Sequence, residues 1–506
     1  MGLLGAPVLA VLVYLSLPDS YIGTAGETVA LTHAGRATAA TGVCMAVWWL
    51  SEALPVYATA LLPLALFPIT GATTIHEAAA PYGHELIYLF MGGFILALSM
   101  EKWGLHRRIA FSALSFVGTV PGLIVGAFML ITALMSMWVT NTATTIMMLP
   151  IAVSVIGLMG GGSQDDDPTV HGRAKLAGDR NFVLCLLLGI AYAASIGGIG
   201  TIIGTAPNLF LVSFIKNQLG VEISFVSWMA IGVPVTLSFL PLTWLALTRF
   251  VFPLSIKKIE GGEALIRDAR SKLGPMHRGE WWTLAVFLLA ALFWIFRPLL
   301  AGIHFGGWQP FAGLTDPGIA ITAALLLFVI PIDIENREFV MDWDTAVRLP
   351  WGLLVLFGGG LSLAAAIDNN GVSQFLGSLS GLAAGMPSLL IVLIIVALVI
   401  FLTELTSNTA TTATLVPILA AVAPGLGLDP LVLIVPAGIA ASCAFMLPVA
   451  TPPNAIVFGS GLVRIPDMSR AGIWLNVLGI GLITALMYLV AMPFLGVKLA
   501  FLTGGS

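Results

Sequence analysis

The strongest indication of the fold is the stretch Met137-Trp138-Val139-Thr140-Asn141-Thr142-Ala143-Thr144-Thr145. Its polar pattern recurs in the second half of the chain as Leu405-Thr406-Ser407-Asn408-Thr409-Ala410-Thr411-Thr412. Each copy lies inside a long apolar segment. An Asn amide buried in hydrocarbon is costly unless a partner satisfies its hydrogen bonds. Two such copies therefore predict a shared ligand between them.

The two copies belong to a longer internal repeat. With a constant offset of 267 residues, Gly92-Gly93 falls on Gly359-Gly360, Gly104 on Gly371, Asn141-Thr142 on Asn408-Thr409 and Pro150 on Pro417. A second motif follows each copy, as Gly204-Thr205-Ala206-Pro207-Asn208 and as Ala450-Thr451-Pro452-Pro453-Asn454. Duplicated apolar halves interrupted by Gly, Pro and Asn are typical of secondary transporters with discontinuous helices around a central site.

Composition places the chain in a membrane. Its 506 residues are 58% hydrophobic and 9% charged, and the mean hydropathy is +1.02. We therefore expect an all-α polytopic protein of the cell inner (cytoplasmic) membrane. Residues 3–17 lack a basic leader and a small-residue cleavage site, so we expect them to stay as the first span. Cys44, Cys185 and Cys443 lie in apolar segments, which predicts packing thiols.

The apolar segments predict about eleven spans and two re-entrant hairpins. The spans fall near residues 3–17, 38–50, 55–70, 87–104, 182–215, 226–252, 281–297, 316–332, 350–368, 431–463 and 471–497. We divide the chain into N-terminal scaffold helices (1–86), a first transport-repeat half (87–224), scaffold helices of the second half (225–349) and a second transport-repeat half with the C-terminal helix (350–506). The first transport half contains a hairpin at 121–157 and a broken helix at 182–215, and the second a hairpin at 387–424 and a broken helix at 431–463.

Lysine and arginine positions predict the orientation. With a cytoplasmic N-terminus and hairpins that return to the side on which they begin, 17 of the 21 basic residues fall in cytoplasmic segments, and the C-terminus is external. The four exceptions are Arg36, Lys216, Arg297 and Lys498. The same bias fits two full spans in place of each hairpin. We favour re-entry because two full spans would place the polar signatures among the lipid headgroups.

Each hairpin tip leaves helix-end backbone groups without intrahelical partners. Carbonyl, hydroxyl and Asn oxygens are ligands suited to Na⁺, while N–H groups with the Asn amide and Thr hydroxyl suit a carboxylate. Alternatively, Ser and Thr hydroxyls bond their own i−4 carbonyls or a neighbouring helix. We expect that alternative for a single Thr, and a ligand site for two Asn-Thr tips in repeat register.

The polar motifs contain no Lys, Arg or His. An anionic substrate would therefore need co-bound cations, which would couple its uptake to sodium. Glu404 is the one acid close to a tip. It is either a proton or sodium ligand or a member of a hydrogen-bond network behind the tip.

Other features have simpler interpretations. Gly92-Gly93 and Gly358-Gly359-Gly360 predict close helix packing, and residues 105–110 predict an amphipathic helix at the cytoplasmic face. Asp165-Asp166-Asp167 predicts a solvated loop without a metal. An intramembrane enzyme would need a nucleophile with a base, paired carboxylates or a metal cluster near the tips. The seven histidines do not lie there, so we predict neither enzymatic activity nor a nucleic-acid partner.

These motifs resemble those of the divalent anion:sodium symporters, which include bacterial sodium-dicarboxylate transporters and animal sodium-coupled dicarboxylate, citrate and sulfate carriers. The paired Ser-Asn-Thr tips of that family match Thr140-Asn141-Thr142 and Ser407-Asn408-Thr409, and its C-terminal signature matches residues 441–457. The resemblance begins near Trp48, with Thr140 standing where the family usually has Ser. It implies a homodimer whose scaffold domains form the interface, while a transport domain with both hairpins moves as an elevator through the membrane lipid.

The resemblance also implies ligands by position. One Na⁺ site would use Ser136, Thr140, Asn141 and Gly204, and its mate Thr403, Thr406, Asn408 and Ala450. Substrate carboxylates would meet Asn141, Thr142, Asn408, Thr409, Thr451 and Pro452. The expected function is sodium-coupled symport of a di- or tricarboxylate of the succinate, malate and fumarate class. The alternatives are a sodium-independent dicarboxylate exchanger, in which a basic side chain replaces a cation, and a sodium-sulfate symporter.

Overall fold

The computed structural model describes residues 2–23, 27–114, 119–159, 180–255, 270–305, 308–379 and 386–497. The described part is mainly helical, which confirms the predicted all-α class. Its strands form two small antiparallel pairs, β1 (Ser20–Ile22) with β2 (Thr28–Ala30) and β3 (Pro331–Asp333) with β4 (Glu338–Phe339). The predicted Asp165–Asp167 loop and the basic residues between 160 and 179 lie outside the described residues.

The first half of the chain contains a peripheral group of helices and then the first repeat. The peripheral group is α1 (Gly2–Ser16), α2 (His33–Ser51), α3 (Val56–Thr59), α4 (Leu62–Thr70), α5 (Ile75–Ala79) and the 3-10 turn η1 (Ala80–Gly83). The helices that follow are α6 (Glu85–Lys102), α7 (Leu105–Leu114), α8 (Pro121–Ser136), α9 (Asn141–Met159), α11 (Arg180–Gly198), α12 (Ala206–Leu219), α13 (Phe225–Leu245) and the π-helix η3 (Ala246–Val251).

The second half repeats this succession after three connecting helices among the described residues. The connecting helices are α15 (Arg278–Ala301), α16 (Asp316–Val329) and α17 (Trp343–Ala346). The second repeat contains α18 (Trp351–Asn369), α19 (Val372–Ser378), α20 (Ser388–Thr403), α21 (Asn408–Val422), the 3-10 turn η5 (Ala423–Leu426), α22 (Pro430–Ala440), α23 (Pro452–Gly459), α24 (Ile465–Leu486), the π-helix η6 (Met487–Ala491) and α25 (Met492–Phe494).

Local sequence signals explain where these helices begin and end. Thr74 and Glu77 form a reciprocal capping box at the start of α5. Pro207 and Pro452 lie in the first turns of α12 and α23, where the N–H that proline lacks would have no helical partner. Gly220 ends α12 in the left-handed conformation at φ +66°, which glycine adopts without strain.

Both polar signatures and both second motifs interrupt helices. Residues 137–140 separate α8 from α9, and residues 404–407 separate α20 from α21. Residues 199–205 separate α11 from α12, and residues 441–451 separate α22 from α23. We call the first two interruptions the tips and the second two the breaks.

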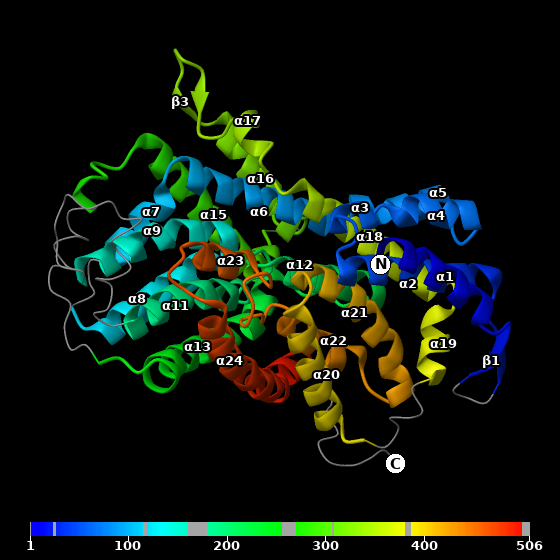
Figure 1. Cartoon of the computed structure of the whole chain (residues 1–506). Coiled ribbons are helices and arrows are strands. Elements are labelled where there is room, and N and C mark those ends of the chain that lie inside the picture. The colour runs from blue at the N-terminus through cyan, green and yellow to red at the C-terminus, as the bar shows by residue number, and fades with distance from the viewer. Residues whose placement is uncertain are drawn as a thin grey trace.

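The two repeats exchange their last arms. The arm α23 packs against α9 and α11 of the first repeat, and the arm α12 packs against α21 and α22 of the second (Figure 1). Other contacts are also duplicated, because α8 packs against α11 and α13 while α20 packs against α22 and α24. The helix contacts therefore follow the internal repeat of the sequence.

Seven helices in the described part of the chain are long and apolar enough to cross a membrane. Shorter apolar helices, of 10 to 17 residues, include α1, α16 and both arms of each hairpin except α21. Because predicted spans such as 3–17 and 316–332 correspond to shorter helices, the count of eleven spans stays a prediction. The structure shows a polytopic helical architecture at this coarser level.

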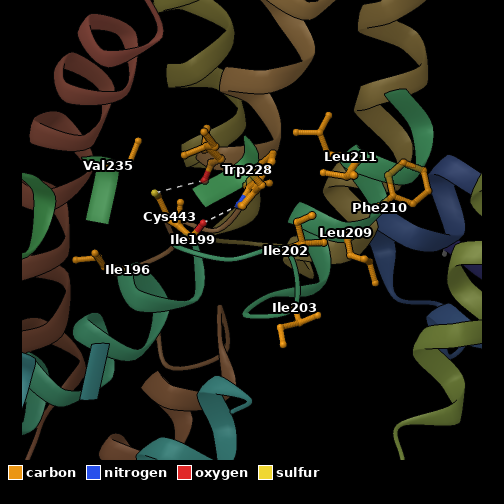
Figure 2. Packing of buried hydrophobic residues seen from close by; sticks show 14 of the residues in the cluster. Ile196, Ile199, Ile202, Ile203, Leu209, Phe210, Leu211, Trp228, Val235 and Cys443 are labelled. Carbon is orange, nitrogen blue, oxygen red and sulfur yellow. Dashed lines mark hydrogen bonds between the residues drawn. The ribbon is translucent and has the colours of Figure 1, made fainter. Parts of the chain in front are cut away.

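Glycines bring helices into backbone contact, as predicted. A Cβ atom on Gly92 would lie 2.5 Å from the carbonyl carbon of Ala320 on α16. A Cβ atom on Gly359 would overlap the carbonyl oxygen of Ala60. The break between α11 and α12 is also tightly packed, because Trp228 of α13 donates from Nε1 to the Ile199 carbonyl at 3.0 Å (Figure 2). The three cysteines are free and buried, which confirms that they are packing thiols.

Ion pairs separate into two groups that match the predicted sides of the membrane. On the predicted cytoplasmic side, the pairs are Lys102–Asp342 at 2.6 Å, Arg108–Glu280 at 2.7 Å, Arg180–Asp467 at 2.5 Å and Arg464–Asp467 at 3.3 Å. On the other side they are Arg36–Asp19, Lys216–Glu85, Arg297–Glu222 and Arg297–Asp316. Within the described ranges, no ion pair joins segments that were predicted on opposite sides.

The contact between α8 and α11 gives a stability prediction. A Cβ atom on Gly197 would lie 2.5 Å from the Cα atom of Ala133. Gly197→Ala should therefore force α8 away from α11 and destabilise the protein by about 1–3 kcal/mol. The measurement is the thermal midpoint of the detergent-solubilised protein. Gly481→Ala on α24 is the control, since nothing lies within 4 Å of its Cβ position. Equal midpoints for the two variants would contradict the packing argument.

Candidate functional site

The two tips and the two breaks meet at one central cavity of ≈ 420 Å³. All six residues predicted to bind substrate line it, namely Asn141, Thr142, Asn408, Thr409, Thr451 and Pro452. Five of the eight predicted Na⁺ ligands also line it, namely Thr140, Asn141, Gly204, Asn408 and Ala450. The other three, Ser136, Thr403 and Thr406, lie behind the tips and do not line the cavity.

Each tip asparagine is held by the hydroxyl that ends the preceding arm. The Ser136 hydroxyl donates to Asn141 Oδ1 at 2.6 Å, and the Thr403 hydroxyl lies 2.7 Å from Asn408 Oδ1. These contacts occupy equivalent positions in the two repeats. They fix the plane of each amide, while a second lone pair on Oδ1 and the amide N–H groups stay available to a ligand.

Each break is held by an asparagine from the arm that follows it. Asn208 Nδ2 lies 3.0 Å from the Gly198 carbonyl and 2.8 Å from the Thr201 carbonyl. Asn454 Nδ2 makes the corresponding contacts at 3.2 Å to Ala444 and 3.0 Å to Leu447. Both asparagines are fully buried. Their amides therefore satisfy carbonyls that the interruption removes from the helical ladder.

Several threonines near the tips bond the backbone instead of facing the cavity. Thr145 and Thr412 each donate to the carbonyl four residues earlier at 2.8 Å. Thr406 donates to the Leu402 carbonyl at 3.0 Å and lies 2.6 Å from the Thr411 hydroxyl. The i−4 interpretation is confirmed for these three residues.

Glu404 belongs to a hydrogen-bond network behind the second tip. Its carboxylate accepts N–H groups of Phe445 at 2.6 Å, Met446 at 2.9 Å and Leu447 at 3.3 Å, all from the second break. Asn476 of α24 donates to the same carboxylate at 2.8 Å. Of the two interpretations that the sequence left open, the structure shows the network.

Residues from outside the repeat motifs also line the central cavity. They include Glu52, Tyr57, Phe94, Leu353 and Leu356, and sequence analysis missed them. Glu52 follows α2 in a left-handed conformation, φ 47° and ψ 31°. The Tyr57 ring packs on Gly352 of α18, where a Cβ atom would come within 2.5 Å of the ring. The available signal was an acid, Glu52, inside an otherwise apolar stretch just before a proline.

The central cavity offers neutral hydrogen-bonding groups rather than cationic side chains. Among the described residues that line it there is no Lys, Arg or His, and Glu52 is the one acid. In the described ranges, no group of three or more His, Cys, Asp or Glu side chains could hold a metal ion. Apart from the Glu52 carboxylate, the groups that could contact a cation are hydroxyl, amide and carbonyl oxygens, which are hard ligands suited to Na⁺.

A second cavity, of ≈ 770 Å³, adjoins the first tip, and we call it the vestibule. Thr140 and Thr142 line both the vestibule and the central cavity. The remaining lining includes Lys102, Arg107 and Arg348, which belong to segments predicted to be cytoplasmic. The first tip is therefore reachable from that side of the protein.

Comparison with known proteins agrees with this site. The family model described as the sodium:sulfate symporter transmembrane region matches residues 10–496. The chain is 41% identical over 499 residues to the sodium-dependent dicarboxylate transporter SdcS of Staphylococcus saprophyticus, covering 98% of this chain and 92% of the relative. It is 39% identical over 456 residues to SdcS of Staphylococcus aureus, covering 90% of this chain and 86% of the relative.

A solved structure shares the fold. The crystal structure of the Alcanivorax borkumensis YdaH transporter superposes with a TM-score of 0.56 at 16% identity, covering 96% of this chain and 97% of that one. The family and these relatives are transporters and not enzymes, which confirms the predicted absence of enzymatic activity. The resemblance inferred from the paired Asn-Thr tips is thus confirmed by a match over nearly the whole chain: the protein belongs to the sodium:sulfate symporter family of membrane transporters.

Proposed function

We propose that this protein is a sodium-coupled symporter of C4-dicarboxylates such as succinate, malate or fumarate. The observation that carries the proposal is the central cavity, in which two Asn-Thr tips converge without a cationic side chain in the described lining. A dicarboxylate has two anionic ends, and the two tips offer a set of N–H and hydroxyl donors to each. Relatives that match nearly the full length are named sodium-dependent dicarboxylate transporters, which supports the same substrate class.

Sodium supplies the charge that the protein lacks. Two carboxylates among neutral dipoles need at least two cations for charge balance, because an uncompensated anion at membrane depth is strongly unfavourable. In the proposed sites, Na⁺ contacts oxygens of Thr140, Asn141 and Gly204 at the first tip. A second Na⁺, at the repeat-related site, contacts oxygens of Asn408 and Ala450 at the second tip. The hydroxyls of Ser136 and Thr403 orient the two asparagine amides.

The proposed mechanism is an elevator. The moving unit contains both hairpins and both broken helices, which interlock through the exchange of α12 and α23 (Figure 1). The helices α6 and α18 lie in the segments predicted as transport halves, yet α6 packs against α15 and α16, and α18 packs against α2, α3 and α4. We therefore place both helices with the static scaffold. In this arrangement the hairpins re-enter the membrane without crossing it. The N-terminus is cytoplasmic and the C-terminus is external. Two scaffolds form the interface of a homodimer.

Uptake of radiolabelled succinate into proteoliposomes tests the function directly. We expect uptake that requires an inward Na⁺ gradient and that malate and fumarate inhibit. Citrate and sulfate belong in the same competition panel, since the family model carries the name sodium:sulfate symporter. Equal uptake in choline and in sodium would favour the sodium-independent exchanger, and preferential inhibition by sulfate would favour the sulfate symporter.

The tip asparagines give the first functional prediction. Asn141→Ala and Asn408→Ala should each lower initial uptake by about 10- to 100-fold, because each removes hydrogen bonds to a charged ligand, while the variants stay folded. Asn454→Ala is the contrasting control, since its side-chain amide donates to the backbone carbonyls of Ala444 and Leu447, and it should lower the thermal midpoint. Wild-type uptake by well-expressed Asn408→Ala would contradict the site.

A second prediction concerns charge movement. If more sodium charge than substrate charge moves per cycle, an inside-negative potential should accelerate uptake. The available driving force is roughly 2.3 kcal/mol per charge per 100 mV. A potassium–valinomycin potential imposed on proteoliposomes at a fixed Na⁺ gradient measures this effect. An initial rate that does not respond to the potential would leave only an electroneutral cycle.

A third prediction tests the elevator. A Cβ atom on Gly93 of α6 would lie 3.6 Å from Ile203 Cβ in the first break, which suits a disulfide. The double variant Gly93→Cys and Ile203→Cys joins the scaffold to the moving unit, so oxidation should stop transport and reductant should restore it. The control pair Gly438→Cys and Leu211→Cys, with Cβ positions 3.4 Å apart, lies inside the moving unit and should leave transport intact. Full activity with the first cross-link quantitatively formed would refute the elevator.

A further inference from the structure

The vestibule connects the first tip to the predicted cytoplasmic side. Its inner end is shared with the central cavity through Thr140 and Thr142. Its lining also includes Arg107 on α7 and Arg348, which lies between α17 and α18. A substrate that reaches the first tip through the vestibule therefore crosses a cavity lined by both arginines.

The two vestibule arginines differ from the other cations near them. Lys102 is paired with Asp342 at 2.6 Å. Arg108, next to Arg107 in sequence, is bound by Glu280 at 2.7 Å and by backbone carbonyls of residues 273–275. Arg107 and Arg348 are exposed, and in the part of the chain that the structure describes neither has a carboxylate within ion-pair distance. Their charge is thus not neutralised by those residues.

The remaining lining does not cancel this charge. Glu101 is the one acid among the described lining residues. His106 is buried, and its Nδ1 lies 2.8 Å from the Met100 carbonyl. With Lys102 already paired to Asp342, the vestibule keeps an excess of positive charge, whereas the central cavity has none from side chains. The lining therefore changes from an excess of positive charge at the vestibule to a central cavity where Glu52 is the one charged residue among the described lining residues.

We propose that Arg107 and Arg348 form a second, transient anion site, which takes the dicarboxylate before it reaches the tips. The inference rests on the proposed function. Guanidinium groups bind carboxylates with paired hydrogen bonds, and two of them from separate elements match a ligand with two carboxylates. A basic cleft raises the local concentration of an anionic ligand and its rate of association. Because the arginines stand outside the central cavity, binding at the tips still depends on Na⁺.

A charge series at one position tests the proposal. Arg348→Cys removes the charge, a cationic methanethiosulfonate reagent restores it and an anionic one reverses it. The three native cysteines are at most 4% exposed, so modification should be selective. In inverted membrane vesicles, where the predicted cytoplasmic side faces the bath, the half-saturating succinate concentration should rise from the cationic to the neutral to the anionic form. At low ionic strength the whole range should be on the order of tenfold and should shrink with added salt.

Controls separate this site from general charge effects. Arg278→Cys, exposed on the same predicted side but not lining the vestibule, should show no such series, and right-side-out vesicles should show none for Arg348→Cys. A series that appears only when the vesicles contain anionic phospholipid would assign the arginines to lipid headgroups and overturn the proposal. The proposal would also be overturned if the half-saturating succinate concentration of sodium-driven uptake stayed the same for all three charges at position 348. Failure of the proposed function would instead appear as absent sodium-driven uptake by the wild type.

Discussion

Four helix interruptions inside an apolar protein leave backbone polar groups that must find other partners. Carbonyl and N–H groups at each interruption lose their helical partners, and hydrocarbon offers none in return. At the breaks, the buried amides of Asn208 and Asn454 take up carbonyls of the unwound residues. At the tips, the amides of Asn141 and Asn408 are only partly engaged by protein hydroxyls. Asn141 and Asn408 both line the central cavity, so the requirement that shapes the interruptions also supports the proposed place of the ligand.

The two repeats meet this requirement differently at one position. In the second repeat, Glu404 accepts N–H groups from the second break and from Asn476. In the first repeat, the equivalent Met137 packs against Gly200, and its carbonyl accepts the Thr201 hydroxyl. A buried carboxylate is tolerable only when several donors compensate its lost hydration. The second break is therefore held by the Glu404 carboxyl group, which accepts its backbone N–H groups, and the first by packing, which makes the two halves of the site chemically unequal.

The sequence carried enough information for the tips and breaks but not for what surrounds them. Asn141 and Asn408 could be identified because an amide in an apolar segment needs a hydrogen-bond partner. Their equivalent positions in the two repeats also make a chance occurrence improbable. Thr406 shares that pattern, yet its hydroxyl donates to the Leu402 carbonyl and does not face the cavity. The sequence pattern does not show toward which side of the helix a side chain points. The sequence predicts the cytoplasmic side for Arg348, but it does not assign Glu52 or Arg348 to a cavity. They line cavities together with tip residues that are distant in the sequence, and nothing local distinguishes Arg107 from Arg108, which is paired with Glu280.

This arrangement explains why sodium coupling does not need a dedicated acidic sodium site. In the proposed cycle, an anion is attracted at the vestibule by full positive charges and then enters a cavity whose described lining has none. Without Na⁺, the dianion at the tips would face neutral dipoles and the acid Glu52, which repels it. With Na⁺ on tip oxygens, the loaded site can pass the apolar surface of Phe94, Leu353 and Leu356 with its charge compensated. Coupling then follows because the tips have no cationic side chain. A cationic side chain there would bind the substrate without Na⁺, and transport would no longer depend on sodium.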